Sequence, residues 1–155
     1  MITGLHHGNV IVSDIERSKR FYTEVLGLQV AMETEIDEAE FARGVGIPGT
    51  KVKGVFFAVP NTPTLIEMFQ YVSPRASRPI PAGSQPSDIG IGHLAFQVDD
   101  IDAVYEKLRE KKVPFVSTPV TLPETHKDVG GVRFCYFKDP DGVLLELIYL
   151  PSKSS

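Results

Sequence analysis

At residues 5–28 the chain reads LHHGNVIVSDIERSKRFYTEVLGL. The first part, HGNVIV at 7–12, is typical of a strand, and Asp14 is placed to cap a helix over about residues 15–26. Gly27 then ends that helix, because glycine readily accepts the left-handed backbone of a helix terminus. This stretch therefore predicts a strand followed by a helix that packs against a sheet.

Three more strands are expected in the first half of the chain. Residues 28–36 read as one strand, and residues 37–50 predict a short helix followed by a glycine-rich connection. Strands at 51–59 and 64–71 then form a hairpin across the turn residues 60–63. The predicted order of elements in this half is βαβββ.

The same order occurs again in the second half. A strand is predicted at 93–98, Asp100 caps a helix over about 101–112, and a strand VPFVS follows at 113–117. The last two strands form a second hairpin, with the sequences GVRFCYF and VLLELIYL. A segment rich in Pro, Ser and Gly at 73–91 separates the two halves and reads as a linker.

This repetition predicts an α+β fold made of duplicated βαβββ modules. The spacing from His7 to Asp14 equals that from His93 to Asp100, at an offset of 93 − 7 = 86 residues. We expect a single domain over residues 1–155, with a first module at 5–72, the linker at 73–91 and a second module at 92–150.

Composition and charge exclude several classes of protein. With a formal charge of −4 and a pI near 5.5, the chain offers no basic field for nucleic acid. No stretch approaches the roughly 18 apolar residues of a membrane span, and residues 1–14 lack the pattern of a signal peptide. We therefore expect a soluble cytoplasmic protein that binds neither nucleic acid nor membrane. The single cysteine, Cys135, lies in an apolar run and is expected to be a core thiol.

Four side chains interrupt apolar strands at matched positions in the two halves. His7 and His93 begin the first strand of each half, and Glu67 and Glu146 lie in the last strand of each hairpin. A buried unpaired carboxylate costs several kcal/mol, so it normally needs a charged partner, a proton or a metal. One such histidine is more often an ordinary core residue, but the joint pattern favours a site.

Two imidazoles and two carboxylates suit a borderline divalent ion such as zinc, nickel, cobalt, manganese or iron, and do not suit calcium. His6 competes with His7 for the ligand role, because only one of two adjacent strand residues faces inward. The spacing to the capping aspartate favours His7. His126, in the polar loop PETHKD, and the cations Arg133, Lys138 and Lys51 are expected to be surface residues.

At these residues the sequence resembles the vicinal oxygen chelate superfamily, which includes glyoxalase I, methylmalonyl-CoA epimerase, extradiol dioxygenases and the fosfomycin and bleomycin resistance proteins. The resemblance covers nearly the whole chain. It is carried by residues 5–28, TLIEMFQY at 64–71, GHLAFQVDDID at 92–102 and FKDPDGVLLELI at 137–148. It implies that the paired βαβββ modules form a cupped, mostly antiparallel eight-stranded sheet.

The resemblance also implies a metal site and a reaction. Its ligands map onto His7, Glu67, His93 and Glu146, in an arrangement closest to that of glyoxalase I. One divalent ion held there would bind two adjacent oxygens of a small-molecule substrate and acidify the C–H beside the carbonyl. Glu146 or Glu67 would then serve as the catalytic base. The expected function is a metal-dependent isomerase or lyase, glyoxalase I-like or epimerase-like.

Two other functions stay open at this point. An iron-dependent extradiol-type dioxygenase uses two histidines and one carboxylate, so a fourth ligand counts against it. A non-catalytic small-molecule or drug-binding resistance protein would not need the acidic ligands. A homodimer is implied by the resemblance, because many relatives pair their modules across subunits. No set of residues indicates a glutathione or coenzyme A site, so the substrate is left open.

Overall fold

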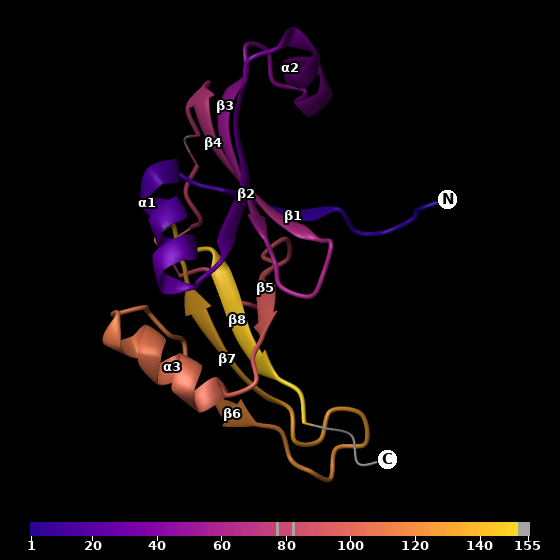
Figure 1. Cartoon of the computed structure of the whole chain (residues 1–155), viewed down its shortest axis with the longest axis vertical. Helices are drawn as coiled ribbons and strands as arrows, with labels where there is room; N and C mark the ends of the chain where they lie inside the picture. The colour runs from indigo at the N-terminus through magenta and orange to yellow at the C-terminus, as the bar shows by residue number, and fades with distance from the viewer. Residues whose placement is uncertain (77, 82, 152–155) are drawn as a thin grey trace. The chain divides into compact units, whose positions relative to one another are not determined.

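The computed structural model describes the chain at residues 1–76, 78–81 and 83–151. Residues 77 and 82, inside the predicted linker, and 152–155 lie outside the described residues. The chain divides into two compact units, Met1–Pro81 and Ala82–Ser155, which we call module 1 and module 2. Each module contains one four-stranded sheet (Figure 1).

The sheet of module 1 has the strand order β1-β4-β3-β2. Strand β1 runs parallel to β4, while β3 is antiparallel to both β2 and β4. Figure 1 shows α2 beyond the end of the β2–β3 hairpin, to which it belongs in sequence. The elements are β1 (His7–Ile11), α1 (Ile15–Arg20), the π-helix η1 (Phe21–Val25), β2 (Gln29–Ile36), α2 (Ala39–Val45), β3 (Lys51–Ala58) and β4 (Leu65–Ser73).

The first helix begins and ends at the predicted residues but changes type midway. The Asp14 side chain accepts a hydrogen bond from the Arg17 backbone N–H at 3.0 Å, and Gly27 has a φ of 81°. From Phe21 the helix widens into η1, where the Thr23 hydroxyl donates to the Lys19 carbonyl at 2.9 Å. Such a side-chain bond competes with the backbone ladder and favours a local change of pitch.

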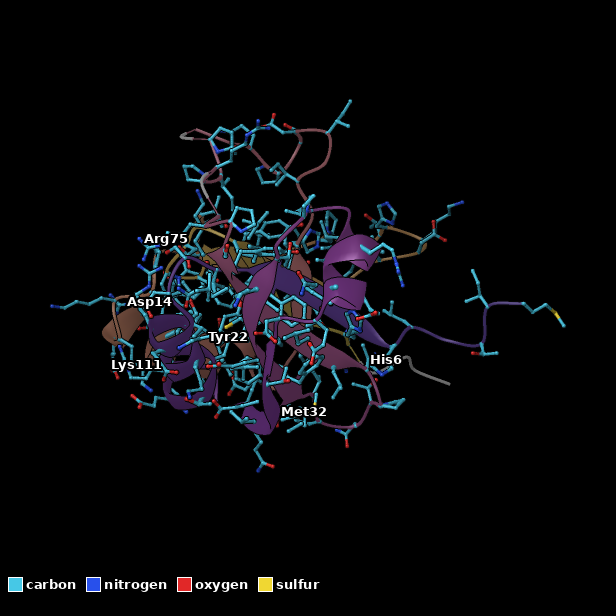
Figure 2. The ribbon with its side chains drawn as sticks, turned by 90° about the horizontal axis from the view of Figure 1, so that it is seen from above. His6, Asp14, Tyr22, Met32, Arg75 and Lys111 are labelled. Carbon is cyan, nitrogen blue, oxygen red and sulfur yellow. The ribbon has the colours of Figure 1, made fainter. Side chains whose placement is uncertain are left out.

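One core layer of module 1 lies between this helix and one face of the sheet. The Tyr22 ring is fully buried and stacks on Phe57 of β3, with ring centroids 5.4 Å apart. Buried residues of β1, β3 and β4 complete this layer, namely Val10, Val55, Ile66 and Met68. In Figure 2, Tyr22 lies beside α1 and His6 lies on the other side of the strands.

Module 2 repeats this arrangement with the strand order β5-β8-β7-β6. Strand β5 runs parallel to β8, and β7 is antiparallel to β8 and β6. The Asp100 side chain accepts from the Ala103 N–H at 2.9 Å and caps the helix, which buries Ile101 and Leu108. The elements are β5 (Leu94–Gln97), α3 (Ile101–Glu110), β6 (Val120–Thr121), β7 (Arg133–Lys138) and β8 (Leu144–Tyr149).

The strand predicted at 113–117 is wrong. Phe115 makes only an isolated bridge to Phe137, and the strand that pairs with β7 is β6, at Val120–Thr121. The Pro114 carbonyl accepts from the Lys138 N–H at 3.0 Å, but proline has no N–H to return the bond. The ladder therefore stops at this residue.

The predicted α+β class with paired βαβββ modules is confirmed. In the part of the chain that the structure describes, eight strands form two four-stranded mixed sheets, one in each module. Among the described residues, no helix is long and apolar enough to cross a membrane.

Candidate functional site: two matched His–Glu pairs

Module 1 brings His7 and Glu67 together on neighbouring parallel strands. His7 lies on β1 opposite Leu65, so it stands diagonally next to Glu67 on β4. The His7 Nε2 atom is 3.3 Å from Glu67 Oε2. The side chain of His7 is 37% exposed and that of Glu67 only 12%. The carboxylate is therefore mostly shielded from water, while the imidazole is partly exposed to it.

Module 2 brings His93 and Glu146 together in the same way. His93 directly precedes β5, and Glu146 lies on β8 opposite Ala95. The His93 Nε2 atom is 2.8 Å from Glu146 Oε2. Their side chains are 38% and 9% exposed, nearly the values of the first pair. The repeat in the sequence therefore corresponds to a repeat in the structure, with one His–Glu pair in each module.

A buried turn sets the start of the strand that carries Glu146. One carboxylate oxygen of Asp139 accepts from the backbone N–H groups of Asp141 and Val143, at 2.9 and 2.8 Å. Asp139 is itself almost fully buried. The motif DPDG thus fixes where β8 begins, and so which face Glu146 occupies.

The other histidines and cations lie elsewhere or have partners of their own. The ring nitrogens Nδ1 of His6 and His7 are 2.8 Å apart, so His6 contacts the pair through its neighbour. His126 Nδ1 accepts from the backbone N–H groups of Asp128 and Val129 at 3.3 Å and so organises its own loop. Arg133 pairs with Asp102 at 2.6 Å, and Lys51 with Asp37 at 3.5 Å.

Sequence reasoning missed two neighbours of the carboxylates. Asn9 of β1 donates through Nδ2 to Glu67 Oε2 at 2.6 Å. Tyr136 of β7 lies opposite Glu146, and its ring meets that of His93 edge to face, with centroids 5.1 Å apart. Burial, followed by the charge of Glu146, raises the pKa of the Tyr136 phenol, so the phenol keeps its proton. The alternation of strand residues placed Asn9 on the face of His7, but only the register shows its partner.

Cys135 is the buried core thiol that the sequence predicted. It is fully buried on β7, and burial, with the nearby charge of Glu146, raises its pKa to about 11. Because the thiolate is the reactive form, we expect a disulfide reagent at pH 7.5 to label the folded chain on the order of 100-fold more slowly than the chain in guanidinium. Equal labelling rates in the two states would contradict this placement of the thiol.

Among the described residues, no group of three or more histidine, cysteine or acidic side chains is arranged to hold a metal ion. The structure brings His7 together with Glu67 and His93 together with Glu146, each pair within its own module.

The comparisons agree with this duplicated architecture. A family model described as Glyoxalase/Bleomycin resistance protein/Dioxygenase superfamily matches residues 4–147. The chain belongs to this superfamily. The match includes both His–Glu pairs and both hairpins, so the resemblance seen in the sequence is confirmed.

Curated members of the superfamily similar to this chain include named epimerases. The 2-epi-5-epi-valiolone epimerase of Actinomyces sp. is 33% identical over 151 residues, covering 96% of this chain and 80% of that protein. The human mitochondrial methylmalonyl-CoA epimerase is 30% identical over 92% of this chain and 72% of its own length. A solved glyoxalase family protein of Bacillus cereus shares the fold, with a TM-score of 0.83, 18% identity and coverage of 97% and 95%.

Proposed function

We propose that this protein is a divalent-metal-dependent isomerase or lyase that moves a proton beside a carbonyl group, in the manner of a glyoxalase or an epimerase. The observation that carries the proposal is the repeated His–Glu pair. In each pair an imidazole nitrogen approaches a largely buried carboxylate oxygen, at 3.3 Å in module 1 and 2.8 Å in module 2.

The donor set fits one divalent ion. Nitrogen from two histidines and oxygen from two glutamates suit zinc, nickel, cobalt, manganese or iron. In both modules the Nε2 and Oε2 atoms already converge, which is the relation that two ligands of one ion require. We propose that His7, Glu67, His93 and Glu146 supply the ligands, either within one chain or within a homodimer.

The metal would supply polarisation of a substrate carbonyl, which makes the neighbouring C–H more acidic. The carboxylates of this chain do the rest: Glu146 or Glu67 takes the proton from carbon on an Oε atom and returns it. The shielding of both carboxylates limits competition from water for that proton. A small substrate with two adjacent oxygens fits this chemistry.

The names of the relatives favour an epimerase within this class. Both curated epimerases are about a third identical to this chain or slightly less, over most of its length. Their names state epimerisation of two unlike compounds, 2-epi-5-epi-valiolone and methylmalonyl-CoA. Removal and return of a proton beside a carbonyl is the step that such substrates share. A homodimer and a cytoplasmic location also stay predictions.

Metal content tests the proposal directly. We expect the chain, purified without added metal, to retain about one divalent ion by elemental mass spectrometry, and we expect Glu67→Ala and His93→Ala to lose it. Nickel, cobalt, zinc or manganese in the parent would fit the isomerase, and iron together with oxygen consumption would favour a dioxygenase.

His126→Asn is the matched control, because it removes an imidazole outside both pairs and keeps a side-chain acceptor for the loop. This variant should hold as much metal as the parent. A parent that contains no ion, and takes up none when zinc, nickel, cobalt, manganese or iron is added, would refute the proposal.

A further inference from the structure

The two His–Glu pairs have the same geometry but different neighbours. On β1, Asn9 lies opposite Glu67, two residues after His7. On β5, Ala95 lies opposite Glu146, two residues after His93. The positions are equivalent in the repeat, yet one side chain carries an amide and the other only a methyl group.

The Asn9 amide makes a short hydrogen bond to the carboxylate beside it. Its Nδ2 atom donates to Glu67 Oε2 at 2.6 Å, and the same oxygen lies 3.3 Å from His7 Nε2. Donation to a charged acceptor gives a bond that is both shorter and stronger than a neutral one. Asn9 is exposed, so packing does not hold its side chain. The hydrogen bond to Glu67 sets the orientation of the Asn9 amide.

We propose that Asn9 is a positioning residue that fixes Glu67 as a permanent metal ligand. The inference rests on the proposed function, since it concerns how the proposed ligand is held. A carboxylate held through Oε2 loses rotational freedom, so that oxygen keeps a constant position beside His7 Nε2. In module 2 the methyl group of Ala95 cannot impose this restraint. The two carboxylates therefore differ in their partners: Glu67 contacts an amide donor as well as an imidazole, whereas Glu146 contacts the His93 imidazole at 2.8 Å.

Cobalt binding to the full chain measures this restraint without any substrate. The chain is stripped of metal with a chelator and titrated with Co²⁺, and the visible absorption bands report both affinity and ligand geometry. We expect Asn9→Leu, which keeps the size of the side chain and removes the donor, to bind Co²⁺ about 10-fold to 100-fold more weakly than the parent. Its absorption bands should also change in position or intensity. Asn9→Ala should behave in the same way.

Ile11→Ala is the matched control, because Ile11 is an exposed residue two positions further along the same strand face. It should match the parent in affinity and spectrum. Parental Co²⁺ affinity and spectrum in Asn9→Leu would overturn the role of Asn9 and leave the metal proposal standing. Failure of the parent and every variant to bind Co²⁺ would instead refute the proposed function, and the role of Asn9 with it.

Discussion

The Glu146→Gln variant is expected to exchange substrate α-protons with solvent 10²-fold to 10⁴-fold more slowly than the parent, which is the range attributed to a positioned acid or base. The glutamine side chain keeps an oxygen for a metal but has no basic carboxylate to take a proton. The measurement is deuterium incorporation in D₂O, followed by NMR, with the two compounds that the relatives' names give, methylmalonyl-CoA and 2-epi-5-epi-valiolone, as the probes under the proposed function. Metal content, measured on the same samples, should stay near that of the parent.

Two further variants make the result specific to one carboxylate. Glu110→Gln neutralises an exposed acid at the end of α3 in the same module and should exchange protons at the parental rate. Glu67→Gln removes the carboxylate that Asn9 holds and should weaken metal binding more than Glu146→Gln does. If Glu146→Gln retains metal and parental exchange while Glu67→Gln loses exchange, the base is Glu67.

Tyr22→Ala should lower the free energy of unfolding by about 3–5 kcal/mol, as other large aromatic truncations in a core do. The ring is fully buried between η1 and β3 and stacks on Phe57, so its removal leaves a cavity and takes away an aromatic contact. Guanidinium denaturation followed by circular dichroism gives this free energy. A loss of that size is a large share of the 5–15 kcal/mol that stabilises a typical domain.

Phe21→Ala is the comparison for this variant, because it truncates the adjacent aromatic residue, which is only half-buried. Its expected loss is clearly smaller. Equal losses of unfolding free energy in the two variants would show that burial does not set the cost of truncation, and would contradict the central place given to Tyr22.

The elements set by neighbouring residues were predictable from the sequence. Asp14 and Asp100 each cap a helix through a backbone N–H three residues further on, as the residue type and spacing indicate. Gly27 has the positive φ that its place after the helix suggests. The His–Glu pairs were also within reach, because strand alternation and the repeat together put like residues at like positions.

Features that depend on strand pairing, and the change of helix type, were not predictable. The apolar run at 113–117 has the sequence pattern of a strand. Pairing with β7 would need a backbone N–H at Pro114, which proline lacks. The π-helix that begins at Phe21 has the same spacing of apolar residues as an α-helix, so periodicity does not distinguish the two. Strand alternation puts Asn9 on the face of His7, but the register that sets it against Glu67 exists only in the folded sheet.

Two copies of a half-length chain would carry an amide beside both carboxylates or beside neither, because identical sequences present identical neighbours. In this protein the two halves occupy one polypeptide, and Asn9 stands in one half where Ala95 stands in the other. Because the two halves have different sequences, the two matched carboxylates need not have the same neighbours. Only one of the two matched carboxylates can then receive a hydrogen bond from an amide at this position, a difference that strict two-fold symmetry forbids.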